Sequence, residues 1–227
     1  AYDLVLSSAA SFSKGVITLP KTLHISYIHS PTRYLWSDTT RYVDELPYPK
    51  FFKWYAPHLL TRIRQWDYLA AQRPDILVAN SKIVQQRIEK YYRRSSDIIH
   101  PPVDVQKFTV GQGQGGYFLA GGRLVSYKRF DLVIQAFNRL GLPLKIYGSG
   151  PALEHLREVA KPNIEFLGRV SDRDLPTLYA NATAFINPQE EEFGITVVEA
   201  MAAGRPVIAF KSGGALETVK PGVSGVF

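Results

Sequence analysis

Three consecutive carboxylates, Glu190 to Glu192, stand directly before an apolar run in the stretch EEEFGITVVEA, and a fourth, Glu199, lies inside that run. The run predicts a helix that begins near Ile195. Carboxylates are favoured near a helix N-terminus because the first N–H groups are free there, and this alone accounts for the first three. It does not account for Glu199, which is flanked by valines and an alanine and needs a polar partner.

A vicinal diol of a sugar is one partner that would suit such a carboxylate. An acidic residue grips the ribose hydroxyls in dinucleotide-binding folds, and the chemistry is the same here. One carboxylate cluster after a strand and a second carboxylate on the next helix could therefore hold two sugars, one on each side of a diphosphate.

Glycine-bearing turns follow four of the predicted strands or precede their helices. Glycine lets the backbone approach a ligand, and helix N-termini favour anions, so four such turns on one sheet edge predict a crevice for a phosphate-bearing ligand. Arg123 and Lys128 come just after the first turn and could reach a diphosphate; as surface cations at a helix start they would be mildly unfavourable. The turns are AGGR (120–123), YGSGP (147–151), EFGI (192–195) and KSGGA (211–215).

Strands and helices alternate in the second half of the chain, which predicts parallel βαβ units and a doubly wound, Rossmann-like domain. The helix over 129–140 is expected to bury Leu132, Val133, Ala136, Phe137 and Leu140. Strands are expected at 117–122, 144–150, 163–168, 183–188 and 206–210.

The first half is less regular, with strands expected at 2–8, 24–29 and 75–81 and a helix at 82–92 capped by Ser81. Between them, 31–73 is rich in aromatic and basic residues and predicts a long helical excursion. The proline- and glycine-bearing segment 100–116 predicts a boundary, so we expect a partial first domain at 1–110 and a second domain at 111–227.

Composition limits the possible functions. The 227 residues include no cysteine, which excludes disulfides and Cys-based metal sites and fits a reducing compartment. Residues 1–110 hold 15 Lys and Arg against 9 Asp and Glu, a net charge of +6, whereas 111–227 hold 12 against 11. This asymmetry favours an anionic partner for the first half: a phosphorylated substrate, an anionic membrane surface or nucleic acid. We find neither a signal peptide nor a membrane-spanning run, and we expect the chain to be part of a longer protein, shortened at both ends.

With these residues in view, the chain resembles the retaining glycosyltransferases of family 4, which have the GT-B fold of two Rossmann-like domains. The motif that carries the resemblance is Glu–x7–Glu, here Glu191 to Glu199, followed by AMAAGRPVIA. The segments GGRLVSYKRFD, YGSGP, FLGRVSD and SGGALETV accompany it in family order, and VANS and IIHPPVD match the family in the first half. The stretch YIHSPTRYLW is similar to bacterial and archaeal mannosyltransferases of surface-polysaccharide assembly.

The resemblance implies a role for each matching residue. Glu191 would bind hydroxyls of the transferred sugar, Glu199 would hold the ribose, and His29 would face the sugar and the acceptor. Arg123 and Lys128 would neutralise the diphosphate and so stabilise the leaving group. The remaining donor-binding positions implied are Gly122, Gly148, Gly168, Val170, Phe193, Gly194 and Ile195.

The implied function is transfer of a hexose, with mannose from GDP-mannose favoured, to a glycan or a lipid-linked acceptor, with retention of anomeric configuration. Neither a metal nor another cofactor is expected, and the sequence has no Asp-x-Asp motif. The expected location is the cytoplasm, at the inner face of the membrane if the basic aromatic region 31–73 contacts anionic lipid; that region could equally be core and solvated surface.

Three alternatives stay open at the level of sequence. The first is the same fold with a UDP-hexose donor, and the second is a non-catalytic module that only binds nucleotide. The third is nucleic-acid binding, suggested by a pI near 9.5. No recognisable nucleic-acid-binding motif accompanies that charge, so nucleic acid is not among the expected partners.

Overall fold

The segment that joins the two halves of the sequence packs on the second half. The computed structural model describes residues 2–45, 49–112 and 115–227, and the chain divides into Ala1–His100 and Pro101–Phe227. The ring of Phe108 packs against Tyr179 at a centroid distance of 5.9 Å, and the Gly111 N–H donates to the Ala203 carbonyl at 3.1 Å. Residues 101–110, which the sequence assigns to the first domain, therefore lie with the second unit.

The first unit is built on a parallel sheet of four strands in the order β1-β2-β3-β4. The last residues of its first three strands, Ala9, Ile28 and Ala79, are paired in register and buried, and they form part of its core. The predicted strands are present, and a two-residue strand, β4, is added to them. The strands are β1 (Leu4–Ala9), β2 (Leu23–Ile28), β3 (Ile76–Ala79) and β4 (Asp97–Ile98).

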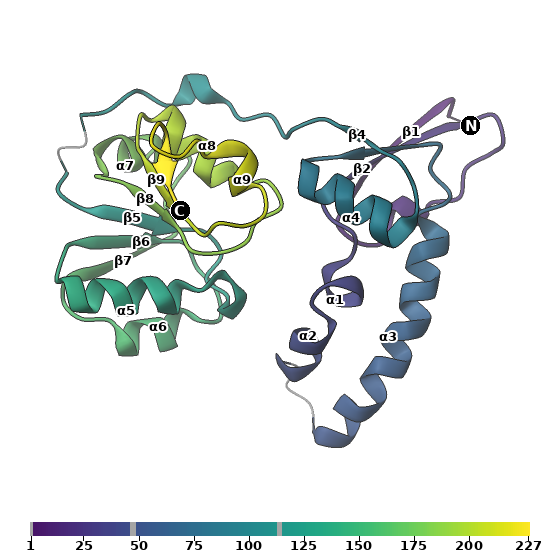
Figure 1. Ribbon diagram of the computed structural model, residues 1–227, viewed down its shortest axis with the longest axis horizontal. Helices are drawn as coiled ribbons and strands as arrows, with labels where there is room; N and C mark the ends of the chain where they lie inside the picture. The colour runs from purple at the N-terminus through teal and green to yellow at the C-terminus, as the bar shows by residue number, and fades with distance from the viewer. Residues whose placement is uncertain (1, 46–48, 113–114) are drawn as a thin grey trace. The chain divides into compact units, whose positions relative to one another are not determined.

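Helices of the first unit follow the predicted pattern. Ser81 caps α4 (Lys82–Tyr92), because its Oγ accepts a hydrogen bond from the Val84 N–H at 3.4 Å. The predicted helical excursion consists of α1 (Arg33–Trp36), α2 (Thr39–Glu45) and the long α3 (Lys50–Ala70), with one short 3-10 turn, η1 (Ser13–Gly15), before them. Figure 1 shows α3 running away from the sheet with α1 and α2 beside it; these helices share a small core of Leu35, Val43 and Leu60.

The second unit is a six-stranded parallel sheet in the order β10-β9-β8-β5-β6-β7. This is the doubly wound strand order of dinucleotide-binding domains. From β5 the chain adds β6 and β7 on one side, then returns and adds β8, β9 and β10 on the other side, so the strand order reverses between β5 and β8. All five predicted strands are present, and a short β10 follows them. The strands are β5 (Phe118–Gly121), β6 (Leu144–Tyr147), β7 (Ile164–Gly168), β8 (Phe185–Asn187), β9 (Val207–Ala209) and β10 (Gly225–Val226).

Helices cover both faces of this sheet (Figure 1). Successive residues of one strand enter different cores: Leu119 packs with the first set of helices and Ala120 with the second. The first set is α7 (Leu175–Asn181), α8 (Ile195–Ala202) and α9 (Ala215–Thr218), and the second is α5 (Phe130–Leu140) and α6 (Leu153–Val159).

The predicted apolar face of α5 is wrong at three positions. Leu132 and Leu140 are 48% and 60% exposed, and Ala136 is exposed as well. The buried residues are Phe130, Val133, Ile134 and Phe137, which follow the i, i+3, i+4, i+7 spacing of one helix face. Leu132, Ala136 and Leu140 are spaced four residues apart on the neighbouring stripe, which faces solvent.

Candidate functional site

The reversal of strand order brings two distant loops together at one edge of the second sheet. Strands β5 and β8 are paired at Leu119 and Phe185, so the turn after Gly121 and the loop after Asn187 leave neighbouring strands at the same end. Ligands of doubly wound sheets bind outside the carboxyl ends of the strands at such a point. The predicted glycine turns 120–123 and 147–151, at the ends of β5 and β6, lie at this edge.

Close packing of backbones accounts for several of these glycines. A Cβ on Gly148 would lie 1.8 Å from the Gly122 carbonyl oxygen, and one on Gly213 would lie 2.2 Å from the Glu191 carbonyl oxygen. Both glycines also have positive φ angles, 114° and 61°. A Cβ on the next residue, Gly214, would lie 2.4 Å from the Phe193 carbonyl oxygen. The four predicted turns therefore lie against one another in two pairs, and glycine is required for that contact whether or not a ligand is bound.

The carboxylate of Glu191 joins the two loops. Its Oε1 lies 2.8 Å from Lys128 Nζ and accepts a hydrogen bond from Gln189 Nε2 at 3.0 Å. Its Oε2 accepts no hydrogen bond from any residue that the structure describes. Lys128 in turn lies beside Gly122, where a Cβ would be 3.5 Å from the ammonium nitrogen. The pair thus presents one free carboxylate oxygen and one cation next to the backbone at Gly122, which carries no side chain.

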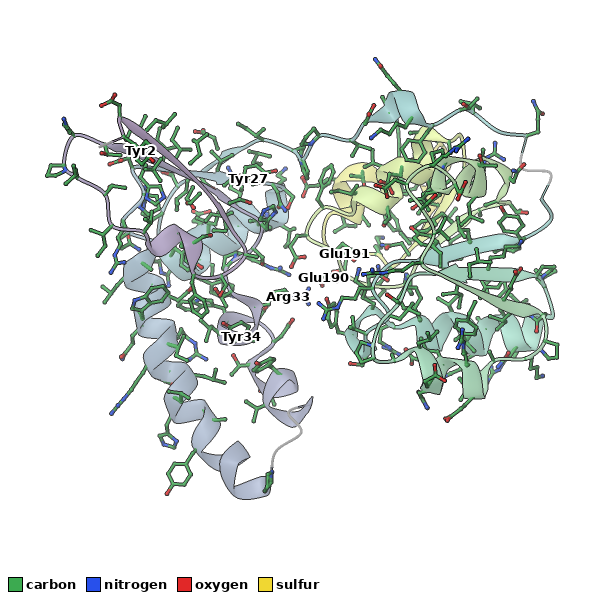
Figure 2. All side chains as sticks on the ribbon, turned by 180° about the vertical axis from the view of Figure 1, so that it is seen from behind. Tyr2, Tyr27, Arg33, Tyr34, Glu190 and Glu191 are labelled. Atoms are coloured by element: carbon green, nitrogen blue, oxygen red, sulfur yellow. The ribbon has the colours of Figure 1, made fainter. Side chains whose placement is uncertain are left out.

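The glutamates before α8 do not cap that helix. Its N-cap residue is Gly194, with φ 88°, and no side chain makes a capping hydrogen bond. Glu190, labelled with Glu191 in Figure 2, accepts a hydrogen bond from Ser212 Oγ at 2.6 Å. The charge cluster therefore ties the β8–α8 loop to the β5–α5 turn and to the loop after β9, so helix-dipole complementarity is a minor part of its role.

Glu199 has the polar partner that its apolar neighbours require. Tyr179 donates from its hydroxyl to Glu199 Oε2 at 3.2 Å, and the Tyr147 hydroxyl lies 2.7 Å from the Tyr179 hydroxyl. Burial raises the pKa of the Glu199 carboxyl, the Tyr179 hydrogen bond opposes that rise, and the negative charge of Asp172 adds to it.

The other donor-binding positions implied by the resemblance differ in exposure. Arg123 is exposed, and Ile195, the first residue of α8, is 45% exposed. Phe193 is buried, and Val170 packs against the core beneath the site. Gly168 ends β7 with φ 65°, and its carbonyl accepts from the Gly148 N–H at 2.7 Å.

Sequence reasoning missed three residues of this region: Gln189, Tyr147 and Tyr179. Gln189 is buried and one of the two donors to Glu191, yet its position in PQEEEFG carries no signal of that role. The tyrosines gave a weak signal, because a hydroxyl in a predicted buried strand or helix face requires a partner.

In the first unit, His29 follows β2 and is exposed. Its Nε2 lies 2.7 Å from Ser8 Oγ on β1, and its ring makes an edge contact with Tyr27. The residue therefore stands at the carboxyl edge of the first sheet, where the sequence put it. Its ring is oriented by a serine that sequence reasoning did not single out.

The basic aromatic region is part core and part surface. Arg64 donates to the Leu35 carbonyl and lies over the Trp36 ring, and Arg73 donates to the Gly15 carbonyl. Both cations are thus used within the fold. Tyr55 is 62% exposed, and an apolar hollow of about 440 Å³ is lined by Phe12, Arg62, Ile63 and Trp66. The side chains of Phe51, Phe52 and Trp54, expected to face an acceptor, lie outside the described residues.

Among the described residues, no three or more His, Asp or Glu side chains are grouped so that they could hold a metal ion. Nor does any of the described helices combine the length and hydropathy needed to cross a membrane.

Comparison with known families identifies the second unit. The family described as "Glycosyl transferases group 1" matches residues 106–227, more than half of the chain. The chain belongs to the group 1 glycosyltransferases. The Lys128–Glu191 pair and Glu199 all lie within the part that matches.

Curated relatives of this glycosyltransferase include enzymes named for mannosyl transfer. It is 28% identical to mannosylfructose-phosphate synthase of Agrobacterium fabrum over 92% of this chain and 53% of that protein. It is 38% identical to the GDP-mannose-dependent alpha-(1-6)-phosphatidylinositol monomannoside mannosyltransferase of Mycobacterium tuberculosis over 46% of this chain and 32% of that protein. The chain spans about half the length, or less, of the curated relatives it matches.

Solved structures show that the glycosyltransferase has the α/β, GT-B fold with parallel sheets. Sucrose-phosphate synthase from Thermosynechococcus elongatus superposes with a TM-score of 0.77 at 18% identity, over 99% of this chain and 60% of that one. Anabaena Alr3699/HepE in complex with UDP-glucose superposes with a TM-score of 0.71 at 20% identity, over 91% of this chain and 58% of that one. The predicted fold class is confirmed.

Proposed function

We propose that this protein is a retaining hexosyltransferase that uses a nucleotide sugar, with GDP-mannose as the favoured donor. The observation that carries the proposal is the Lys128–Glu191 pair beside Gly122 at the strand-order reversal. A cation and a sugar-binding carboxylate are needed side by side where a diphosphate meets a hexose. Membership of the group 1 glycosyltransferases supports glycosyl transfer as the reaction.

In this proposal Lys128, with Arg123, binds the donor diphosphate and stabilises the charge that develops on it as the sugar departs. Glu191, held through Oε1 by Gln189, offers Oε2 to hydroxyls of the transferred hexose. The bond from the anomeric carbon to phosphate breaks, and a bond to the acceptor oxygen forms on the same face. The acceptor proton goes to the departing phosphate, and no metal takes part.

Glu199 holds the ribose, and the loop from Gly168 to Ser171 lies beside the base. We assign this donor role to the second unit, residues 101–227, and an acceptor role to the first unit, residues 1–100, with His29 facing the acceptor. Transfer takes place on the cytoplasmic side. The partner of the first part is an anionic glycolipid or membrane surface, because the exposed Arg62 adjoins the apolar hollow formed with Phe12, Ile63 and Trp66.

A UDP-hexose donor is the second candidate. It is favoured by the likeness to Anabaena Alr3699/HepE, whose structure was solved with UDP-glucose. The two candidates share every residue named above and differ only in the base and the hexose. A single titration series therefore separates them.

The proposal is tested first by calorimetric titration of the chain with GDP, UDP, ADP and their hexose conjugates. We expect selective binding of one nucleotide, weakened in Glu199→Ala. Transfer of labelled mannose from GDP-mannose to a lipid extract is then expected to fall at least about a hundredfold in Glu191→Gln, because a carboxylate contact to the reacting sugar is lost. Undiminished transfer in that variant, or transfer abolished by EDTA, would contradict the mechanism.

A further inference from the structure

A hydrogen-bonded chain of two tyrosines leads from the core of the second unit to Glu199. Tyr147 is the last residue of β6, Tyr179 lies on α7, and Glu199 lies on α8. The two hydroxyls are 2.7 Å apart, and Tyr179 reaches Glu199 Oε2 at 3.2 Å. Because the Tyr179 hydrogen is given to the carboxylate, the Tyr147 hydroxyl must donate to the Tyr179 oxygen.

Both hydroxyls are placed where a plain hydrophobic core would serve the fold better. Tyr179 is fully buried and Tyr147 nearly so, in a cluster that includes Leu119, Phe185 and Val197. Burying a hydroxyl costs free energy that its hydrogen bond only offsets, and phenylalanine would fill the same volume without that cost. The two hydroxyls are explained if their role is to hold the Glu199 carboxylate in one position at the edge of the core.

The end of β5 is shaped to admit the Tyr147 ring. A Cβ on Gly121 would lie 2.2 Å from two ring carbons of Tyr147. No other residue could stand at Gly121 while the ring keeps this position. The glycine that ends β5 thus serves the tyrosine chain, and its neighbour Gly122 lies beside Lys128.

We propose that Tyr179, supported by Tyr147, is a positioning residue that orients the Glu199 carboxylate toward the vicinal diol of the nucleotide ribose. This inference rests on the proposed function, because it requires Glu199 to bind ribose. Tyr179 occupies one lone pair of Oε2, which leaves Oε1 and the second lone pair of Oε2 for two sugar hydroxyls. Both tyrosines stay protonated at neutral pH, because burial raises the pKa of each phenol.

The consequence is specificity for ribose over deoxyribose. A carboxylate fixed in one rotamer can accept from both diol hydroxyls, whereas a freely rotating one gains less from the second hydroxyl. Deleting the Tyr179 hydroxyl should therefore weaken binding of ribonucleotides and leave 2′-deoxynucleotides less affected. A general loss of packing would weaken both equally.

The test is titration of the full chain with GDP, UDP and ADP and with the 2′-deoxy form of whichever binds. In Tyr179→Phe we expect the ribonucleotide to bind about tenfold more weakly and its preference over the deoxynucleotide to shrink. The matched control is Tyr117→Phe, since Tyr117 is a buried tyrosine of the same cluster whose hydroxyl donates to the Leu178 carbonyl at 2.8 Å. It should leave the preference unchanged.

Each outcome decides the inference. If Tyr179→Phe keeps the wild-type preference, or loses no more of it than Tyr117→Phe does, the positioning role is overturned. If Tyr179→Phe does not fold, Tyr147→Phe must reduce the preference in the same direction or the role is likewise overturned. Unchanged nucleotide binding in Glu199→Ala, or no binding by the wild type, would overturn the proposed ribose role itself and the inference with it.

Discussion

At the scale of single residues, three carboxylates of the candidate site, those of Glu190, Glu191 and Glu199, are each held by a defined protein partner. Glu191 is fixed at one oxygen by Lys128 and Gln189, and Glu190 is bound by Ser212. Such fixation lowers the cost of ordering these side chains when a donor binds. In the proposed function, the Lys128 ammonium beside Gly122 is the group that meets the donor diphosphate.

Glu199 gives a prediction for nucleotide binding at different pH values. Because burial raises the pKa of its carboxyl above the usual 4.5, protonation begins at a higher pH than for an exposed glutamate. The ionised form is the one that accepts from two ribose hydroxyls, so affinity should fall as the pH drops through the raised pKa. Calorimetric titration from pH 8 to pH 4.5 checks this, and Glu199→Gln should remove that part of the pH dependence.

The same pKa predicts the sign of an effect on stability. A carboxyl whose pKa is raised on folding holds its proton more tightly in the folded state, so its contribution to stability is present at low pH and lost as the pH rises through the raised value. Glu199→Gln, which is uncharged throughout, should therefore raise the melting midpoint at pH 7, and the gain should shrink toward pH 4. A variant less stable than the wild type at pH 7 would contradict the assigned shift.

At the scale of elements, one buried carboxylate holds the helical excursion of the first unit. Asp67 on α3 accepts from Lys14 Nζ at 2.6 Å and Thr32 Oγ1 at 2.9 Å through Oδ1, and from Trp36 Nε1 and the Tyr92 hydroxyl at 2.8 Å through Oδ2. These donors belong to η1, the loop after β2, α1 and α4. Asp67 and Lys14 are both buried, and burial lowers the pKa of Lys14 even beside the carboxylate.

Replacing Asp67 by asparagine should destabilise the first unit strongly. Asp67→Asn keeps the shape but leaves the Lys14 ammonium buried without a counter-charge, which costs about 3 to 5 kcal/mol. Urea denaturation followed by tryptophan fluorescence measures this cost. Asp75→Asn is the matched control, since Asp75 is exposed and accepts one bond, from the His24 N–H at 2.7 Å, worth about 1 kcal/mol. Equal costs for the two variants would contradict the central role of Asp67.

At the scale of the whole molecule, each compact unit has its own parallel sheet and its own hydrophobic clusters. The predicted contacts to the nucleotide all lie in the second unit, and the excess positive charge lies in the first half of the sequence. The division of labour proposed here therefore follows the division of the fold, with donor binding in one unit and acceptor contact in the other.

This division predicts that residues 101–227 bind nucleotide without the first unit. Its two clusters pack on both faces of one sheet, which is the condition for independent folding. Expressed alone, it should bind the preferred nucleoside diphosphate within about threefold of the full chain. Calorimetry of the fragment checks this, with residues 1–100 as the control that should not bind. A folded fragment that fails to bind would assign part of the nucleotide site to the first unit.

Much of the architecture could be predicted from local sequence. Buried strands such as 144–147 and helices such as 130–140 correspond to largely apolar segments that end at glycine or polar residues. The alternation of strands with helices along the chain predicts a parallel sheet. The errors are equally local: two-residue strands such as β4 and β10 carry too few residues to leave a pattern, and the face of α5 was misassigned by one stripe.

The sequence by itself determined that strands and helices alternate, that glycine turns end several strands, and that Glu191 and Glu199 flank the start of one helix, since each is a property of neighbouring residues. Only the tertiary structure decided which distant groups meet. Lys128 reaches Glu191 because the strand order reverses between β5 and β8, and Tyr147 reaches Tyr179 because Gly121 leaves room for its ring. Such contacts depend on how elements pack, and no short stretch of sequence contains that information.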